Sequence, residues 1–349
     1  MELASTRSMR PVVHPGAWRA ADLTDRRSIT FELGEVHLQA LDRALGVARA
    51  SGRATEELTR EDFPLHAIGA DLKAICDQVQ HGRGIVLLRG LPVARYSRDD
   101  ACRMFWGLGT HFGRAVSQSL MGDRLGHVTN ISGDNPAERG YRSRRELSMH
   151  TDSDDLLMML CLRNARSGGQ SRFVSALTIY NEMLESHAQF LPILMRGFRY
   201  HWRGEQAEGE EPITPYRVPV FSRSQEMLSC VYLRAFIDMA AEDLGEPLGE
   251  EEQAALAAFE ALCERTDLQL ALDLEPGDAY VLNNYTVLHS RTAFVDHEAP
   301  EDRRHLLRLW LKAADGRPVV EAVRRFYRDD GITAREHTGT LFVHTHAPR

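Results

Sequence analysis

The stretch 148–176, SMHTDSDDLLMMLCLRNARSGGQSRFVSA, contains three short runs of strand-forming residues separated by polar and glycine-containing turns. Because short runs bounded by turn residues are typical of strands, it predicts strands at 148–152, 156–162 and 171–176. The chain shows no regular alternation of strand and helix around them. Many short strands without that alternation favour a β-sandwich or a jelly roll.

The rest of the chain adds further strands and several helices. A buried strand is predicted at the glycine-bounded residues 84–90, and others at 268–272, 279–282, 287–290 and 306–312, with irregular strand-like sequence at 200–232. Apolar residues at helical spacing predict helices at 35–51, 68–80 and 179–194, one from Ser97 onward and one after Glu250. We therefore expect an α+β, mainly β fold with a jelly-roll core and flanking helices. The simplest division is an irregular and helical N-terminal arm, residues 1–60, packed on one catalytic domain, residues 61–349.

The composition is that of an ordinary globular protein. The 349 residues are 43% hydrophobic and 26% charged, with a formal net charge of -8. This balance does not favour a nucleic-acid partner, which normally needs a clustered basic face. No apolar run is long enough for a membrane span or a secretory signal, and the five cysteines lack CxxC spacing. We expect a cytoplasmic protein with reduced thiols and no membrane partner; the oligomeric state, homo-oligomers included, stays open.

The segment Met149-His150-Thr151-Asp152 carries the first sign of chemistry. On a strand, residues i and i+2 project to the same side, so His150 and Asp152 would point at one place. The best third partner is His289, which lies beyond the Pro276-Gly277-Asp278 turn and the strand that follows it. Two histidines and one carboxylate on one face of a metal form the facial triad of non-haem iron(II) oxygenases, which leaves positions open for other ligands.

Two arginines further along the chain support a co-substrate site. If 306–310 is a strand, Arg304 and Arg308 share a face with Leu306 and Trp310. Buried guanidinium groups are costly unless each meets an anion. A dicarboxylate that also binds the metal would supply such anions, and arginine binds carboxylates through a bidentate fork.

These segments resemble the taurine dioxygenase family, the TauD/TfdA-like group. The resemblance rests on His150-Thr151-Asp152, the run from Leu160 to Ser171, the stretch Asn283 to Arg291 and the two arginines, and it is clearest from Gln118 to Lys312. It implies a double-stranded β-helix, iron(II), 2-oxoglutarate and dioxygen, and an oxidative decarboxylation of 2-oxoglutarate coupled to oxidation of a small substrate.

The resemblance also implies roles for single residues. His150, Asp152 and His289 match the iron ligands, and Arg304 matches the arginine that binds the distal carboxylate of 2-oxoglutarate. Ser171 stands where the family commonly has a threonine that helps to bind the same group; it retains the hydroxyl, but its rotamer is less restrained. Arg308 matches a second active-site arginine that touches the co-substrate or an acidic group of the substrate. Asp152 disfavours halogenation, because the related halogenases lack that carboxylate.

The substrate itself is not identified by the sequence. Arg308 indicates a small polar molecule with a carboxylate or amino-acid-like group, which the enzyme would hydroxylate, desaturate or cyclise. Candidate pocket residues near the HxD segment are Gln118, His127, Tyr141 and Ser148. Two alternatives remain open at this point: a zinc-dependent hydrolase that uses the same triad, and a catalytically inactive jelly-roll binding protein.

Overall fold

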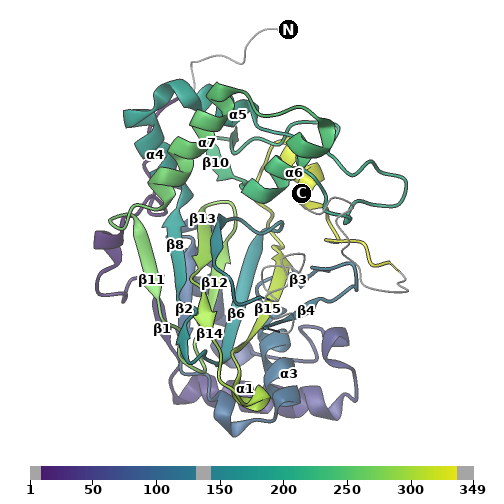
Figure 1. Ribbon diagram of the computed structural model, residues 1–349. Coiled ribbons are helices and arrows are strands. Elements are labelled where there is room, and N and C mark those ends of the chain that lie inside the picture. Colours follow the sequence, from purple (N-terminus) through teal and green to yellow (C-terminus); the bar gives the residue numbers. More distant parts are fainter. Residues whose placement is uncertain (1–8, 131–142, 336–349) are drawn as a thin grey trace.

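Two facing β-sheets form the centre of the computed structural model, which describes residues 9–130 and 143–335 (Figure 1). The larger sheet has the order β1-β2-β12-β6-β15-β3, and β4 also pairs with β15. Its strands are β1 (Thr30–Glu32), β2 (Ile85–Arg89), β3 (Arg114–Ala115), β4 (Leu125–Thr129), β6 (Leu156–Arg163), β12 (Ala279–Asn283) and β15 (His305–Lys312).

The smaller sheet has the order β11-β8-β13-β5. Its strands are β5 (Leu147–His150), β8 (Ser171–Ser175), β11 (Gln269–Leu272) and β13 (Val287–Arg291). Two short ribbons complete the strands: β7 (Ser167–Gly168) with β14 (Phe294–Val295), and β9 (Phe221–Ser224) with β10 (Met227–Cys230). Two facing sheets with this connectivity form the double-stranded β-helix that the sequence predicts.

Alternation along the strands of the larger sheet assigns its two faces to different cores. On β6, Met158 and Leu160 pack toward the helices, whereas Leu157 and Met159 pack between the two sheets. The same division holds on β15, where Leu307 faces the helices and Leu306 faces the smaller sheet. This is the period of two that a strand imposes on its side chains. Both faces are apolar, which explains why these strands read as continuous hydrophobic runs.

Helices cover the sheets in two groups. The outer face of the larger sheet packs against α1 (Glu35–Ala50), α2 (Gly69–His81) and α3 (Arg98–Gly109). The second group packs around β9 and β10 and consists of α4 (Ala176–Ser186), α5 (Leu191–Arg196), α6 (Arg234–Leu244), α7 (Glu250–Cys263) and α8 (Glu321–Tyr327). Figure 1 shows α4 to α7 gathered at the end of the sheets opposite α1 and α3.

Most predicted elements agree with the structure to within a few residues, but the single helix predicted at 179–194 is wrong. The chain forms α4, a 3-10 turn at Ala188–Phe190, and then α5. Pro192 lies in the first turn of α5. A proline lacks the N–H of a helix interior and clashes with the carbonyl four residues earlier, so one continuous helix cannot pass through it. Helices α6 and α8 were not among the predicted elements.

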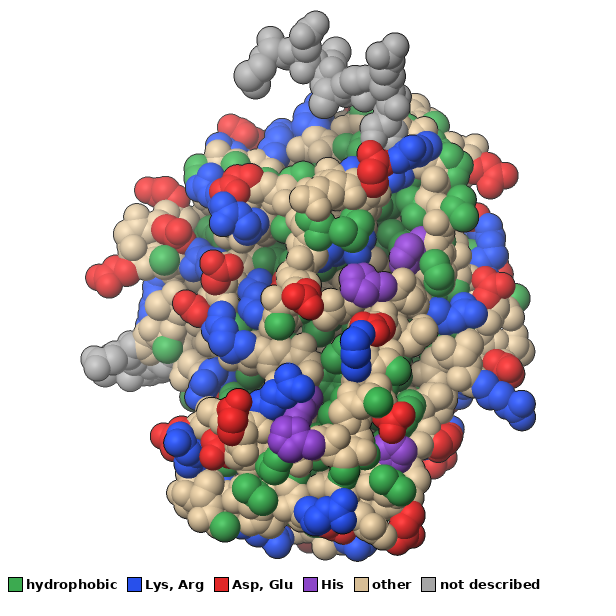
Figure 2. All heavy atoms as spheres, turned by 180° about the vertical axis from the view of Figure 1, so that it is seen from behind, with side chains coloured by type: hydrophobic (Ala, Val, Ile, Leu, Met, Phe, Trp, Pro, Cys, Tyr) green, Lys and Arg blue, Asp and Glu red, His purple; other side chains and the backbone are tan. Residues whose placement is uncertain are grey.

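The surface carries side chains of both charges (Figure 2), and the cysteines are unpaired thiols. In the view of Figure 2, acidic and basic side chains are interspersed rather than gathered by sign. All five cysteines are free. None of the helices in the described ranges is long and apolar enough to cross a membrane.

Candidate metal and co-substrate site

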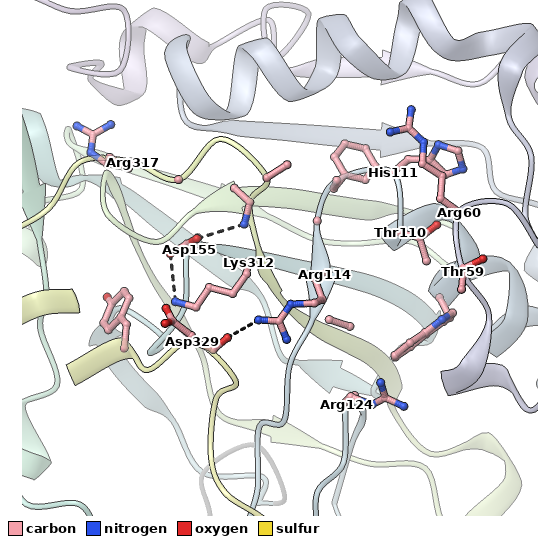
Figure 3. Close-up of a pocket in the computed structure, with 18 of the residues that line it drawn as sticks. Thr59, Arg60, Thr110, His111, Arg114, Arg124, Asp155, Lys312, Arg317 and Asp329 are labelled. Atoms are coloured by element: carbon pink, nitrogen blue, oxygen red, sulfur yellow. Dashed lines mark hydrogen bonds and ion pairs between the residues drawn. The ribbon is translucent and has the colours of Figure 1, made fainter. Parts of the chain in front are cut away.

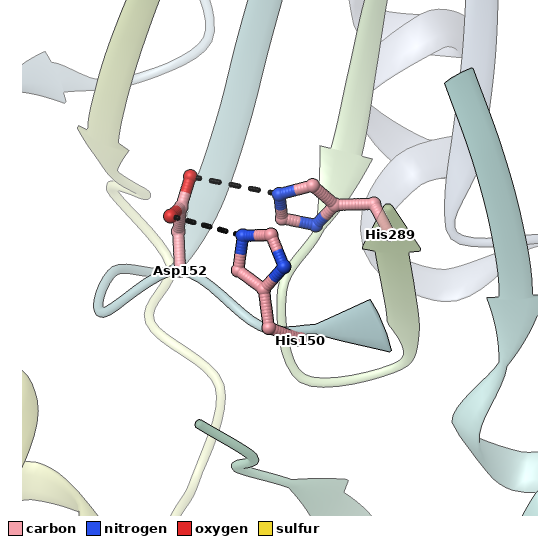
Figure 4. Close-up of side chains that lie close together, drawn as sticks. All are labelled: His150, Asp152 and His289. Carbon is pink, nitrogen blue, oxygen red and sulfur yellow. Dashed lines mark ion pairs between the residues drawn. The ribbon is translucent and has the colours of Figure 1, made fainter. Parts of the chain in front are cut away.

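The pairing of β5 with β13 brings the two predicted histidine ligands together. His150 and His289 are direct partners in this antiparallel pair, and their ring centroids are 4.4 Å apart. Asp152 reaches the same place: its Oδ1 lies 3.9 Å from Nε2 of His150 and its Oδ2 lies 3.7 Å from Nε2 of His289. One potential ligand atom from each residue lies within 4.8 Å of the others. Figure 4 shows the three side chains pointing toward one another.

The backbone conformation that places Asp152 at the site differs from the predicted one. The strand was expected to run to residue 152, but β5 ends at His150. Beyond it the backbone turns to other partners, because the N–H of Thr151 donates to the carbonyl of Tyr232 (2.9 Å) and the N–H of Asp152 donates to Oδ1 of Asn284 (3.2 Å). The convergence of His150 and Asp152 therefore comes from a turn held by distant residues, not from strand alternation.

The surroundings of the triad hold each group in the form that a divalent cation requires. Nδ1 of His150 lies 2.8 Å from the carbonyl of Ser148 and donates to it, so that Nε2 is the ring nitrogen that faces the site. Burial, helped by His150, lowers the pKa of His289 to about 3, so this ring is neutral at physiological pH. Burial by itself would raise the pKa of Asp152, but Arg308 and the two histidines outweigh it and hold that pKa below its usual value.

A small cavity continues from the triad between the two sheets. All three predicted co-substrate residues, Ser171, Arg304 and Arg308, line it and are buried. No described residue accepts a hydrogen bond from Nη1 of Arg304. The apolar and aromatic part of the wall comes from Val128, Leu147, Leu157, Met159, Tyr280 and Leu306.

Arg308 lies between the triad and Gln118. Its Nη1 is 3.8 Å from Oδ2 of Asp152, and its Nε donates to Oε1 of Gln118 at 2.5 Å. Gln118 is 1% exposed, and its amide nitrogen donates to the carbonyls of Arg124 and Arg308. Gln118 therefore supports Arg308 through a hydrogen bond and does not line the small cavity; its role in a substrate pocket stays a prediction.

Of the other predicted pocket residues, the two that the structure describes, His127 and Ser148, do not line the cavity. His127 points away from the cavity that its neighbour Val128 lines, and its Nδ1 lies 2.9 Å from Nε2 of His305. Ser148 is exposed and acts through its carbonyl on His150. Tyr141 lies outside the described residues. Strand alternation explains the result for His127, because adjacent residues of β4 face opposite sides of the sheet.

Two further residues, Trp310 and Arg291, belong to the site, and neither was predicted to have a role there. Trp310 donates its indole N–H to Oδ2 of Asp152 at 2.9 Å. Arg291 lines the same cavity as Arg304 and is buried. Burial, together with the charge of Arg304, lowers the pKa of Arg291 to about 9. The sequence does contain a sign of this position. Arg291 follows His289 by two residues, and on a strand this spacing places both side chains on one face of β13.

A larger cavity of about 1170 Å³ lies elsewhere, and no triad residue lines it (Figure 3). Several of its cations already have anionic partners. Lys312 lies 3.3 Å from Oδ1 of Asp154 and 3.4 Å from Oδ1 of Asp155, and Arg124 pairs with Glu56. Asp154 and Asp155 thus connect the end of β15 to the start of β6 through Lys312.

The residues fit the groups that such a site would bind. Two imidazoles and one carboxylate are a suitable donor set for iron(II), and three ligands leave positions open on an octahedral ion. The partnerless N–H of Arg304, buried beside the hydroxyl-bearing Ser171, matches the far carboxylate of a dicarboxylate. A double-stranded β-helix with this set between its sheets defines the class of non-haem iron oxygenases that use a 2-oxo acid.

Comparison with known proteins identifies the family within that class. Residues 50–310 match the model of the taurine catabolism dioxygenase TauD, TfdA family, so the chain belongs to this family. Its enzymes are oxidoreductases that use iron(II), 2-oxoglutarate and dioxygen. The FR-33289 synthase of Streptomyces rubellomurinus is 31% identical over 314 residues, which cover 88% of this chain and 92% of that protein.

Solved structures show the same fold at low sequence identity. An asparagine oxygenase in complex with Fe(II), 3-hydroxyasparagine and succinate is 15% identical with a TM-score of 0.64, and the match covers 81% of this chain and 93% of that one. The non-haem iron oxygenase OrfP with Fe and α-ketoglutaric acid is 13% identical with a TM-score of 0.58, covering 81% and 94%. Family membership decides for an oxygenase over the zinc hydrolase and the inactive binding protein.

Proposed function

We propose that this oxygenase oxidises a small polar substrate with a carboxylate or amino-acid-like group and releases succinate and carbon dioxide. His150, Asp152 and His289 hold the iron, while Ser171 and Arg304 bind the distal carboxylate of 2-oxoglutarate. When bound, the iron and the 2-oxo acid supply the oxidising power. The protein supplies the ligands, the orientation of the co-substrate and a site shielded from water.

The observation that carries this proposal is the meeting of two kinds of residue in one cavity. The triad lies at one end, and Arg304, with a partnerless N–H, lies in the same space between the sheets. A zinc hydrolase would need the triad, but its reaction gives no reason for a buried arginine with a partnerless N–H in the same cavity. A 2-oxo dicarboxylate needs both, because one end chelates the metal and the other end needs a cation.

Arg308 supports an anionic substrate. It is buried, it lies 3.8 Å from Asp152, and Gln118 holds it in place, so its charge is directed into the site at the metal. A substrate carboxylate bound there would bring the neighbouring C–H bonds close to the iron. The solved relatives, crystallised with 3-hydroxyasparagine and with (3S)-hydroxy-L-Arg, support an amino-acid-like substrate. Hydroxylation, desaturation and cyclisation all stay within the proposal.

The first test uses anaerobic protein with iron(II) and 2-oxoglutarate. We expect a weak visible metal-to-ligand band, and succinate after oxygen is admitted. A panel of small carboxylates, amino acids and sulfonates is then added, and a member that raises succinate formation identifies the substrate class. Slow succinate that no panel member stimulates would support the oxygenase and count against this substrate class. The absence of both band and succinate would overturn the proposal.

Two variants and one matched control sharpen the result. Asp152→Ala should abolish coupled turnover, and Arg304→Gln should weaken the visible band at a given concentration of 2-oxoglutarate. Arg303→Gln is the control, because the Arg303 side chain donates to the carbonyl of Glu298, outside the cavity. Full product formation by Asp152→Ala would refute the triad assignment.

The domain division, a cytoplasmic location and the oligomeric state stay predictions.

A further inference from the structure

Arg291 is a buried cation whose hydrogen bonds are only partly satisfied. It is 5% exposed, and its Nη2 donates to the carbonyls of Ser143 and Arg145. No described residue partners its Nε or its Nη1. Because Arg291 follows His289 by two residues on β13, its side chain lies on the same face as that metal-site histidine and lines the same cavity.

The sheet register places Arg291 directly beside the predicted co-substrate residues. Arg291 and Ser171 are cross-strand partners in the β13–β8 pair, so their Cβ atoms are separated by about 5 Å on one face. Arg304 directly precedes β15 of the other sheet, and both arginines contact Phe294: Cζ of Arg291 lies 4.7 Å, and Cζ of Arg304 5.1 Å, from the centroid of that ring. Two guanidinium groups and one hydroxyl therefore line the same cavity.

Within the described ranges, no carboxylate forms an ion pair with either guanidinium group. Asp296 accepts from the backbone N–H of Arg304 and opposes part of the effect of burial on the pKa of both arginines, but among the described residues it forms no hydrogen bond with either guanidinium group. Two like charges buried close together with unused N–H groups are unfavourable unless an anion lies between them. An oxyanion with several lone pairs satisfies both, since each arginine offers a planar set of donors.

We propose that Arg291 is a second arginine for the distal carboxylate of 2-oxoglutarate, which Arg291 and Arg304 bind together beside Ser171. This inference rests on the proposed function, because it assigns the anion to the co-substrate. The same guanidinium holds the backbone at Ser143 and Arg145, just before β5, so co-substrate binding and the approach to His150 share one side chain.

The test is a titration of 2-oxoglutarate into anaerobic iron(II) protein, followed through the visible band and independent of turnover. Arg291→Gln should raise the Kd for 2-oxoglutarate by about tenfold or more, the effect of losing one charge-assisted contact. Arg291→Lys, which keeps the charge but loses the fork, should recover part of the affinity. Pyruvate, which has no distal carboxylate, is the second probe, and its weaker binding should be the same in the parent protein and in Arg291→Gln.

Arg317→Gln is the matched control. Arg317 is a half-buried arginine that also donates to a backbone carbonyl, that of Leu228, but it does not line this cavity. Its variant should keep the parent Kd, and circular dichroism should show all variants folded.

Each outcome decides between the two proposals. If Arg291→Gln binds 2-oxoglutarate normally while Arg304→Gln does not, the role of Arg291 is refuted and the proposed function stands. If neither variant weakens binding, the assignment of this cavity to the co-substrate fails as well. Equal losses for 2-oxoglutarate and pyruvate in Arg291→Gln would place its effect at the metal and overturn the inference.

Discussion

Trp310 is the residue that orients the carboxylate of the triad. Its indole N–H donates to Oδ2 of Asp152 at 2.9 Å, inside a buried site. Groups that hold a metal ligand in place typically change metal affinity by about 10- to 100-fold when they are removed. Trp310→Phe keeps the aromatic packing and removes the donor, so we expect about tenfold weaker iron(II) binding. An iron titration in the presence of 2-oxoglutarate, followed by the visible band, measures this.

Trp106→Phe provides the comparison for Trp310. The indole of Trp106 donates to the carbonyl of Leu58 in a buried place remote from the triad. This variant should lower the free energy of unfolding and leave iron affinity unchanged. Unaltered iron affinity in folded Trp310→Phe would show that Asp152 does not depend on that hydrogen bond.

For single residues, the sequence indicates which side chains can bind a metal or an anion, but it does not indicate which distant residues they contact. The triad could be predicted because two histidines and a carboxylate are the ligand set that an iron(II) oxygenase uses: His150, Asp152 and His289. The role of Arg291 depends on which residue of β8 lies across from it, and that register is a long-range property of the fold. The turn that directs Asp152 into the site likewise depends on Tyr232 and Asn284, which lie far away in the sequence.

The turn before β12 controls how that strand enters the larger sheet. Gly277 has φ +95, and a Cβ atom there would lie 2.1 Å from the carbonyl oxygen of Leu91. Any other residue would bear both the backbone strain and the clash. Gly277→Ala should therefore lower the free energy of unfolding by about 2 kcal/mol or more, measured by urea denaturation.

A glycine in a helix should give the opposite result. Gly46 lies inside α1, and a Cβ atom there would meet nothing within 4 Å. Gly46→Ala should therefore raise the free energy of unfolding by about 0.5 to 1 kcal/mol, because glycine is a poor helix former. Equal effects of the two substitutions would mean that the conformation at Gly277 imposes no strain.

Elements with a strong local signal were predicted, and elements that depend on tertiary contacts were not. Helix α1 has clear periodicity and strand β2 is a continuous apolar run, whereas α8 has only seven residues. A helix of that length is not stable alone in water. It forms because Val323, Phe326 and Tyr327 pack into the core around α4 and α7. The break between α4 and α5 could have been predicted from the sequence, because Pro192 disfavours a continuous helix there.

The whole molecule builds the site from both sheets at once. The smaller sheet supplies the histidines through β5 and β13, and the larger sheet supplies Arg308 and Trp310 through β15. Neither sheet alone holds a complete site, so the donor set exists only in the folded chain. A ligand that binds only the native state stabilises it by mass action, and iron(II) with 2-oxoglutarate should therefore raise the unfolding temperature of the protein.

Acid should weaken the fold through a histidine outside the metal site. His305 on β15 is 3% exposed; its Nε2 lies 2.9 Å from Nδ1 of His127 on β4, and its Nδ1 lies 3.4 Å from Nη2 of Arg163 on β6. Burial lowers the pKa of His305 to about 3, and His127, Arg98 and Arg163 add to the effect. In the unfolded chain the pKa of histidine is about 6.5.

Between these two pKa values the unfolded chain binds a proton at His305 that the folded chain does not bind. The free energy of unfolding therefore falls as the pH drops below about 6.5, and the contribution of His305 is fully present only above that value. Between about pH 7.5 and about pH 5, the parent protein should lose about 1 to 2 kcal/mol more stability than His305→Gln, which has no titrating ring. Urea denaturation of both proteins at the two pH values measures the difference. Parallel losses in the two proteins would mean that His305 takes up a proton in the folded state, and that the pair with His127 tolerates the charge.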